Sequence, residues 1–343
     1  MVNNLYIVTP RGFCAGVEMA IKALTWMLKI YDETIYCYHE IVHNDWIVEK
    51  FKDKNIKFIE SPDELPLGSV LMLSAHGTAP NIEKNFNSIS SVQVNAVCPL
   101  VTKVHHEAKR FTESGKQIIY VGHKNHDEAI GALGVAPESM FLVEKKEDLN
   151  NIDIQSNEVA LLAQTTLAMS EWKPIMESAK LLYPELNMPR KSDLCYATTN
   201  RQEAVINVSS LVDVVIVVGS DTSSNTKALV STIKNLGKES YRVNTIDEID
   251  NLDLESKNVA ITAGASAPDH IVQEIITRLN PKNTEHFENT DEKEYFPLPK
   301  ELRSNISAIS NFLLNIFPEN NVEPIKSVNK DKLWNATEAL SSL

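Results

Sequence analysis

The sequence predicts an α/β protein of three small parallel-sheet lobes, arranged with pseudo-threefold symmetry around one central site. Apolar β-rich runs alternate with amphipathic helical stretches, which is typical of parallel sheets with right-handed crossovers. A second observation is a junction that recurs three times, in which an apolar run passes through a cysteine into a helix, at Cys14, Cys98 and Cys195. The gaps between these cysteines are 84 and 97 residues, and each gap suits one small α/β unit.

The first lobe is expected over residues 1–92. An amphipathic helix follows Cys14, and two β-rich runs, TIYCYHEIVHN and SVLMLSAHG, end near His43 and His76. Ligands of parallel sheets bind at the carboxyl ends of the strands, so both histidines are candidate binding residues. Cys37 lies inside the first run and is expected to fill the core rather than to bind a ligand.

The second lobe is expected over residues 93–190, with the β-rich runs QIIYVGHKNHDE and EVALLAQTT. A carboxyl group next to a site histidine in a closed pocket has its pKa raised by desolvation, so Glu128 is a candidate proton donor. Threonine hydroxyls at the end of the second run can bind a substrate hydroxyl. The site residues expected in this lobe are Cys98, His126, Glu128, Thr165 and Thr166.

The third lobe is expected over residues 191–281, with the runs VDVVIVVGSDTSSN and NVAITAGAS. Hydroxyls, an amide and backbone N–H groups at helix starts bind phosphate without a net positive charge. The same residue types also cap helices, and the two roles are compatible. The site residues expected here are Cys195, Ser223, Ser224, Asn225 and Ser266.

Residues 282–343 form a C-terminal segment outside the repeat. It contains a short ordered return, one amphipathic helix within ISAISNFLLNIF, and a polar tail with the composition of a mobile segment.

The repeat extends beyond the cysteines. A first polar marker follows the cysteine by 29, 28 and 28 residues, at His43, His126 and Ser223. A second follows it by 62, 67 and 71 residues, at His76, Thr165 and Ser266. A short strand with an acidic turn lies between the two markers in each lobe. Three features in one order at nearly one period indicate an internal repeat.

Composition narrows the class of protein. The formal net charge of −13 argues against a general affinity for nucleic acid or for an anionic membrane. The N-terminus lacks the pattern of a signal peptide, and no apolar stretch has the length of a membrane span. Four widely spaced cysteines are a poor disulfide framework. We therefore expect a cytoplasmic enzyme with reduced thiols.

The three equivalent cysteines predict a metal centre. A thiol at a helix N-terminus meets the positive end of the helix dipole, which favours the thiolate. Three thiolates suit either zinc or an iron–sulfur cluster, and a four-iron cluster on three cysteines leaves one iron open. The cysteines alone therefore do not decide the function. The chain could be an iron–sulfur enzyme, a zinc-dependent hydrolase of a small phosphorylated metabolite, or a non-catalytic paralogue of such an enzyme that binds a cluster. No Walker A or G-x-G-x-x-G pattern is present, which disfavours ATP and dinucleotides.

A family resemblance rests on motifs that run in order from Pro10 to Pro268. They are PRGFCAGVEMAI, HEIVHN, SAHG, CPLVTKVH, the H-x-E of NHDE, QTTL, CYATTNRQEAV, SSN and TAGASAP. On these motifs the chain resembles the LytB/IspH family of 4-hydroxy-3-methylbut-2-enyl diphosphate reductases, which catalyse the last step of the non-mevalonate isoprenoid pathway. The chain departs from the usual family pattern at Tyr38, Asn95, Val97 and Asp127, and its tail beyond Arg303 is additional.

The resemblance implies a [4Fe–4S] cluster on the three equivalent cysteines, with the substrate hydroxyl on the open fourth iron. It implies that Glu128 relays protons, with His126 and Thr165 close by. Two electrons and two protons would then remove the hydroxyl as water, through an allyl species, to give isopentenyl or dimethylallyl diphosphate. The electrons would come from a ferredoxin- or flavodoxin-type partner. The residues implied to hold the diphosphate are His43, His76, Ser223, Ser224, Asn225 and Ser266.

Overall fold

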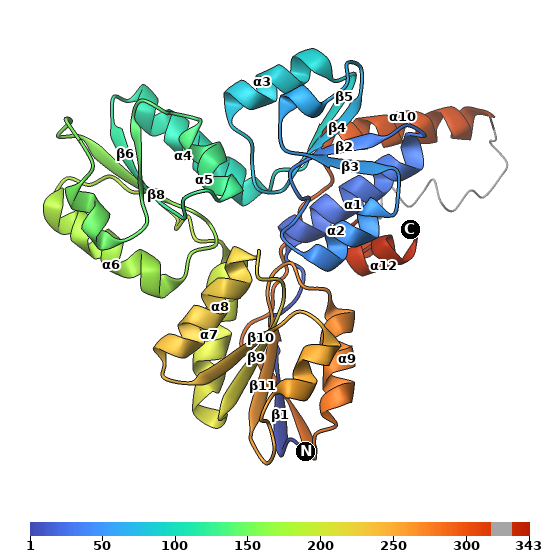
Figure 1. The fold of residues 1–343 in the computed structure, drawn as a ribbon. Coiled ribbons are helices and arrows are strands. Elements are labelled where there is room, and N and C mark those ends of the chain that lie inside the picture. The colour runs from blue at the N-terminus through green and yellow to red at the C-terminus, as the bar shows by residue number, and fades with distance from the viewer. Residues whose placement is uncertain (317–330) are drawn as a thin grey trace. The chain divides into compact units, whose positions relative to one another are not determined.

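The computed structural model describes residues 1–316 and 331–343 as three α/β lobes, each built on its own parallel sheet (Figure 1). The chain divides into two compact units. The first unit comprises Met1–Cys14 and Leu100–Lys293 and holds sheets A and C; the second comprises Ala15–Pro99 and Glu294–Leu343 and holds sheet B. Every paired strand in these sheets is parallel, which confirms the predicted fold class.

Sheet B forms the core of the second unit, with strand order β3-β2-β4-β5. Its strands are β2 (Ile35–Tyr38), β3 (Ile56–Ile59), β4 (Val70–Leu73) and β5 (Val92–Asn95). The helices of this unit are α1 (Ala15–Ile30), α2 (Asp45–Lys52), η1 (Pro62–Glu64), α3 (Pro80–Ile89), α10 (Lys300–Ile316) and α12 (Ala336–Ser341). The four apolar residues that predict α1, namely Val17, Ala20, Ile21 and Leu24, are all buried. Their burial fixes the helix that starts one residue after Cys14.

Sheet C has strand order β7-β6-β8 and is covered on both faces. Helix α6 packs on one face, whereas α4 and α5 pack on the other. The strands are β6 (Gln117–Val121), β7 (Met140–Val143) and β8 (Val159–Ala163). The helices are α4 (Pro99–Glu113), α5 (Asp127–Leu133), η2 (Lys146–Asn150) and α6 (Met169–Leu182). Burial on both faces explains why these strands are continuous apolar runs in the sequence.

Sheet A has strand order β10-β9-β11-β1-β12. Its strands are β1 (Asn4–Thr9), β9 (Val214–Val218), β10 (Glu239–Val243), β11 (Val259–Ala263) and β12 (Asn283–Glu288). The helices of this lobe are α7 (Tyr196–Val208), η3 (Ser209–Leu211), α8 (Ser224–Asn235), η4 (Ile246–Asn251) and α9 (Asp269–Leu279). Helices α7 and α8 share one core cluster with β1, β9 and β11. That packing positions the start of α7, next to Cys195, beside the start of α8.

The internal repeat is visible in individual hydrogen bonds. In each lobe the acidic turn accepts a backbone N–H from four residues earlier in the chain, which ties the turn to the end of the preceding strand. The bonds are Glu60 N to Glu64 Oε1 (3.0 Å), Glu144 N to Asp148 Oδ2 (3.0 Å) and Asn244 N to Glu248 Oε1 (3.3 Å). The three lobes therefore share local geometry as well as element order.

The predicted lobe boundaries need correction at both ends of the first lobe. Strand β1 lies in sheet A, between β11 and β12, rather than with the strands of residues 1–92. Strand β5 extends to Asn95, so sheet B continues past the predicted boundary at residue 92. Strand β12, from the segment 282–343, also joins sheet A. A repeat period locates equivalent residues, but it does not determine which sheet a terminal strand completes.

The described part of the C-terminal segment, residues 282–316 and 331–343, is more ordered than its composition predicts. Helix α10 confirms the predicted amphipathic helix. Residues 331–343 are also folded, because α12 contacts α1 and the Trp334 ring meets Trp26 edge-on, with ring centroids 5.7 Å apart. The rest of the predicted mobile tail, residues 317–330, lies outside the described residues.

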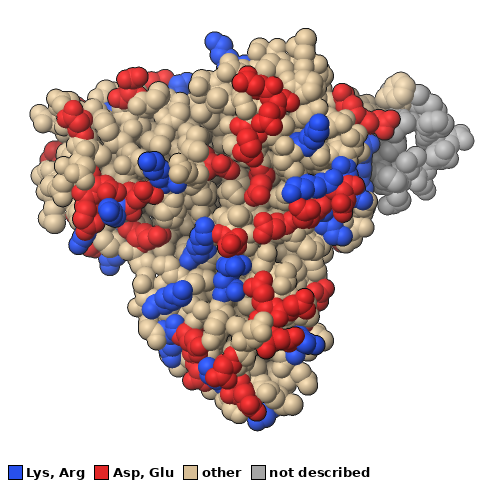
Figure 2. All heavy atoms as spheres, in the orientation of Figure 1, with Lys and Arg blue, Asp and Glu red and all other residues tan. Residues whose placement is uncertain are grey.

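Charged side chains of both signs are interspersed on the face shown in Figure 2. Lysine and arginine form short stripes there, bordered by aspartate and glutamate. Among the residues that the structure describes, no helix combines the length and the apolar character needed to cross a membrane.

Candidate functional site

The three predicted metal-binding cysteines have equivalent backbone contacts. Each cysteine donates its backbone N–H to a carbonyl that lies two residues after the end of a strand. In each case the cysteine and that strand belong to the same unit. The three bonds, from Cys14 to Ala265, from Cys98 to Ala75 and from Cys195 to Thr165, each measure 3.0 Å. The internal repeat therefore places the backbone of all three cysteines in the same way, at the carboxyl ends of β11, β4 and β8.

These bonds correct one detail of the predicted repeat. Thr165 occupies the position of Ala75 and Ala265, whose carbonyls receive the cysteine N–H groups. The residue that corresponds to His76 and Ser266 is therefore Thr166. The sequence spacing differs by several residues between lobes, so it did not distinguish the two neighbouring threonines.

The donor set fits a group with positive charge. Cys14, Cys98 and Cys195 are each partly exposed, whereas Cys37 is fully buried and its pKa is raised by burial, which confirms Cys37 as a core residue. Burial, followed by the charge of Cys14, raises the pKa of Cys195 to about 12. The expected effect of the helix N-terminus on this thiol is therefore outweighed. A bound cation would reverse that balance, because a coordinating thiol is deprotonated.

Cys195 also connects to a polar residue that the sequence analysis did not single out. Its Sγ atom is the N-cap of α7 and accepts the N–H of Thr198 at 3.3 Å, while the Thr198 hydroxyl lies 3.0 Å from the same sulfur. Asn225 donates to that hydroxyl at 3.2 Å. The only sequence signal for Thr198 was its place three residues after a cysteine at a helix start, where a capping contact is expected.

Glu128 is a buried carboxyl group in the second lobe, with 2% of its surface exposed. Thr165 donates its backbone N–H to Oε1 at 2.6 Å and its hydroxyl to Oε2 at 3.1 Å. His126 caps α5, with Nδ1 accepting the N–H of Glu128 at 3.2 Å. Desolvation raises the pKa of Glu128 to about 7, although the Thr165 hydrogen bonds oppose the shift. At neutral pH this group can both donate and accept a proton.

Gln164, the residue before Thr165, is a second buried polar side chain in these loops. Its side chain donates to the hydroxyl of Thr166 at 2.8 Å and accepts the N–H of His123 at 2.9 Å. Gly122 allows this arrangement, because a Cβ atom there would lie 3.2 Å from the Gln164 oxygen and 2.7 Å from the Tyr120 ring. The loops that hold Glu128 and Thr166 are therefore fixed by buried polar contacts.

The predicted Ser/Asn cradle lies at the N-terminus of α8. Ser223 caps this helix by accepting the N–H of Thr226 at 3.3 Å, and its hydroxyl also accepts a hydrogen bond from Ser266 at 3.4 Å. Ser224 and Asn225 occupy the first turn and are buried. A helix N-terminus with several hydroxyls nearby is an anion-binding arrangement.

Two glycines set the position of that helix. A Cβ atom on Gly264 would lie 2.1 Å from the Thr226 hydroxyl oxygen, and one on Gly219 would lie 2.5 Å from it. The start of α8 thus approaches the ends of β9 and β11 more closely than any side chain would allow.

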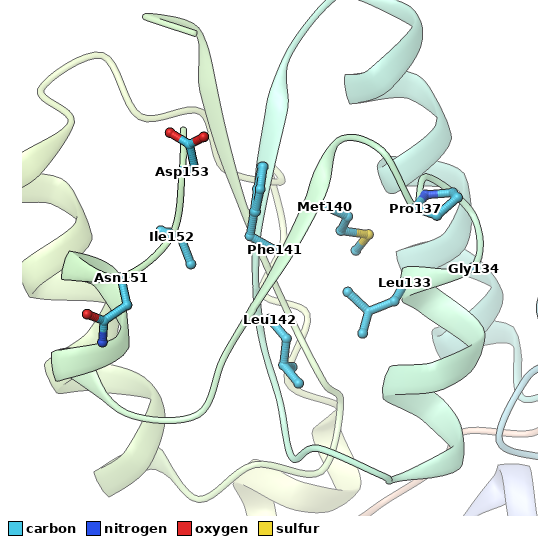
Figure 3. Close-up of a pocket in the computed structure, with 9 residues that line it drawn as sticks. All are labelled: Leu133, Gly134, Pro137, Met140, Phe141, Leu142, Asn151, Ile152 and Asp153. Atoms are coloured by element: carbon cyan, nitrogen blue, oxygen red, sulfur yellow. The ribbon is translucent and has the colours of Figure 1, made fainter. Parts of the chain in front are cut away.

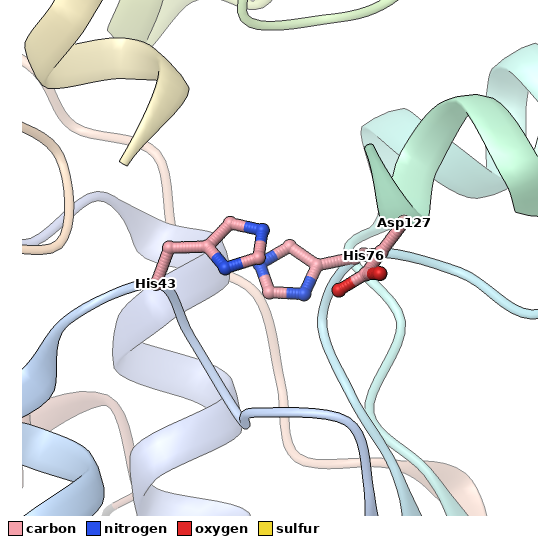
Figure 4. A group of neighbouring side chains, drawn as sticks. All are labelled: His43, His76 and Asp127. Carbon is pink, nitrogen blue, oxygen red and sulfur yellow. The ribbon is translucent and has the colours of Figure 1, made fainter. Parts of the chain in front are cut away.

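His43 and His76 lie together in the second unit, as the sequence predicts from their places after β2 and β4. Their rings are stacked, with centroids 3.9 Å apart and planes inclined by 13° (Figure 4). Asn44, and not His43, is the N-cap of α2, so His43 precedes the position held by His126 and Ser223. The stacked pair offers imidazole donors suited to an anionic ligand.

A separate groove borders the edge strand β7 of sheet C (Figure 3). It is lined mostly by apolar side chains, among them Leu133, Met140 and Leu142. None of its lining residues belongs to the predicted site.

Fold and site together define a class of α/β enzymes with three cysteine-bearing lobes, here with a buried carboxyl group of raised pKa and a hydroxyl-rich helix N-terminus. Residues 5–280 match the family model described as LytB protein. The chain therefore belongs to the LytB family.

Relatives named as reductases and a solved structure agree with this membership. The chain is 40% identical to the 4-hydroxy-3-methylbut-2-enyl diphosphate reductase of Rhodopirellula baltica, across 88% of this chain and 96% of the relative. It is 38% identical to the reductase of the same name from Yersinia pestis, across 89% and 99%. The solved E-1-hydroxy-2-methyl-but-2-enyl-4-diphosphate reductase of Plasmodium falciparum superposes with a TM-score of 0.86 at 33% identity, covering 90% of this chain and 99% of that one.

Proposed function

We propose that this chain reduces 4-hydroxy-3-methylbut-2-enyl diphosphate, removing its hydroxyl group to give isopentenyl and dimethylallyl diphosphate. Family membership and relatives named for this reaction support the proposal. The observation that carries it is Glu128, a fully enclosed carboxyl group whose pKa of about 7 suits it to deliver a proton at neutral pH. The net change takes up two electrons and two protons and releases one water.

Cys14, Cys98 and Cys195 are the residues that would hold a [4Fe–4S] cluster. When bound, such a cluster supplies electrons one at a time and offers one iron without a protein ligand. The equivalent N–H contacts of the three cysteines support this ligand set. We further propose a cytoplasmic location and a ferredoxin- or flavodoxin-type protein as the electron source.

The residues of the chain divide the remaining tasks. Ser223, Ser224, Asn225 and Ser266 bind the diphosphate at the N-terminus of α8, with His43 and His76 contributing imidazole donors. Thr165 holds Glu128 in place through two hydrogen bonds, while His126 fixes the backbone on which Glu128 lies. Glu128 gives its proton to the departing hydroxyl, which leaves as water. Thr166 and His126 border the same loops and contact the substrate.

The deciding experiment is anaerobic turnover of the diphosphate with a chemical reductant. We expect brown protein with about four irons per chain, as a cubane cluster requires, and reductant-dependent formation of both products. Colourless, zinc-loaded protein that hydrolyses the substrate without reductant would support a hydrolase instead. Iron-loaded protein without turnover would support a non-catalytic paralogue.

Glu128→Gln tests the proton donor directly. The variant should retain iron and bind the diphosphate, but lose turnover by about 10²- to 10⁴-fold, the usual contribution of general acid catalysis. Glu185→Gln, at an exposed position of the same unit, is the matched control and should behave like the parent chain. Equal turnover in both variants would refute the role of Glu128.

A further inference from the structure

A chain of hydrogen bonds links Cys14 to Cys195 within the first unit. The Cys14 N–H donates to the carbonyl of Ala265 at 3.0 Å, and the N–H of Ala265 donates to Asn225 Oδ1 at 2.9 Å. Asn225 Nδ2 then donates to Thr198 Oγ1 at 3.2 Å, and that hydroxyl lies 3.0 Å from the Cys195 sulfur. Thr198 is fully buried and Asn225 nearly so.

The backbone N–H of Ala265 fixes the direction of the hydrogen bonds that Asn225 and Thr198 make. A backbone N–H can only donate, so the Asn225 atom that faces Ala265 must be its carbonyl oxygen. The NH₂ group of Asn225 therefore faces Thr198 and donates to the hydroxyl oxygen. The hydroxyl proton of Thr198 must then point elsewhere, and among the contacts of the described residues the acceptor in reach is Cys195 Sγ.

We infer that Thr198 donates an O–H···S hydrogen bond to Cys195 and that Asn225 fixes the direction of this bond. Thr198 is then a positioning residue, and it tunes the electron affinity of the group that Cys195 binds. The Thr198 N–H donates to the same sulfur at 3.3 Å, so one residue supplies two donors to one ligand atom.

The expected consequence concerns charge on the sulfur. Hydrogen bonds to a cysteine ligand withdraw electron density and stabilise the more negative, reduced state of an iron–sulfur cluster. Loss of one such bond therefore makes the cluster harder to reduce. The inference on electron affinity rests on the proposed function, whereas the hydrogen bond itself does not.

Thr198→Val is the first test, because it removes the hydroxyl and preserves the shape of the side chain. We expect the midpoint reduction potential, measured by EPR-monitored titration without substrate, to shift to a more negative value. Thr198→Ser retains the donor and should match the parent chain. Thr232→Val is the matched control for a buried threonine of the same unit, since its hydroxyl donates to Ala228.

Asn225→Asp tests the direction of the bond. An aspartate accepts the Ala265 N–H but cannot donate to Thr198, so the threonine hydroxyl is drawn to the carboxylate and away from the sulfur. Because the added carboxylate charge by itself also lowers the reduction potential, this variant is compared in the cluster-free chain, where the S–H band of Cys195 should shift as in Thr198→Val. This variant also keeps the inference testable should Thr198→Val fail to fold.

A second readout needs no cluster. In the full chain purified with chelator and reductant, the infrared S–H stretching band of Cys195, assigned by its loss in Cys195→Ser, should shift in Thr198→Val but not in Thr198→Ser. A shifted band would uphold the hydrogen bond whether or not the chain binds iron, whereas failure of the untreated, anaerobically purified chain to bind iron would contradict the proposed function alone. An unchanged band, or equal potentials in Thr198→Val and the parent chain, would overturn the inference.

Discussion

Thr165 donates both its backbone N–H and its hydroxyl to the carboxylate of Glu128, one to each oxygen. These bonds stabilise the ionised form, yet burial outweighs them and raises the pKa of Glu128 to about 7. The carboxyl group is therefore held in one orientation while it keeps a proton that an exposed glutamate releases. The Thr165 hydrogen bonds therefore set the orientation of the carboxyl group, whereas its burial sets its protonation.

Burial of Glu128 predicts a pH dependence of stability. Below the ordinary pKa of 4.5 the group is protonated whether the chain is folded or unfolded, so it has no effect. Between pH 4.5 and about 7 the unfolded chain releases the proton of Glu128, whereas the folded chain keeps it. The free energy of unfolding therefore falls as pH rises through this range, and above pH 7 the full loss is about 3 kcal/mol. Urea unfolding at pH 5 and pH 8 should show that Glu128→Gln loses this dependence. Equal pH slopes in both chains would contradict the assignment.

Thr165→Val should shift the pH profile of turnover. The variant loses the hydroxyl that stabilises the ionised carboxylate, so the pKa of Glu128 rises further, by about one unit for one lost hydrogen bond. Because the proton donor must be protonated, the fall in kcat at alkaline pH should move to higher pH. Thr165→Ser should restore the parent profile. A lower kcat with an unmoved profile would indicate a packing role for Thr165.

Gly264→Ala should weaken binding of the diphosphate. The new Cβ atom would lie 2.1 Å from the Thr226 hydroxyl, so the start of α8 must move, and Ser223 and Asn225 with it. We expect KM to rise about tenfold, equivalent to about 1.4 kcal/mol of lost binding, with a smaller change in kcat.

Two further variants test this explanation. Thr226→Ala removes the clashing oxygen, so combining it with Gly264→Ala should recover part of the affinity. Gly237→Ala strains a left-handed turn with open space around it, and it should lower stability without raising KM. A similar rise in KM for Gly237→Ala would show that general destabilisation is responsible.

The sequence predicts the elements that depend on local pattern. The runs that became β6, β8, β9 and β11 are apolar because both faces of their sheets are covered, so composition alone identifies them. The three cysteine junctions were also identified, since the same local geometry requires the same residue types in each lobe. Cys37 was correctly separated from them by its place inside a strand.

Features that depend on distant parts of the chain were not predictable. Strand β1 pairs with β11 on one side and with β12 on the other, and both partners lie far from β1 in the sequence. The role of Thr198 depends on Asn225, 27 residues later, and on Ala265 beyond it. A buried polar network is specified by contacts in space, so periodicity carries no signal for it.

The C-terminal segment contributes a buried ion pair that should be essential for stability. Lys22 of α1 lies 3.1 Å from the carboxylate of Asp331, and their side chains are 3% and 9% exposed. Lys22 also donates to the Asp331 carbonyl at 3.0 Å, and the Tyr295 hydroxyl bonds to the same carboxylate. The segment after Arg303 thereby fixes the helix that follows Cys14.

Asp331→Ala leaves the Lys22 charge buried without its carboxylate, so we expect the free energy of unfolding to fall by about 3–5 kcal/mol. Lys22→Met combined with Asp331→Leu replaces both charges by apolar groups and should recover most of that loss. Glu49→Ala breaks an exposed pair with Lys52 and should cost less than about 1 kcal/mol. Urea unfolding of the full chain measures all three. A small effect of Asp331→Ala, similar to that of Glu49→Ala, would mean that Lys22 reaches solvent when its partner is removed.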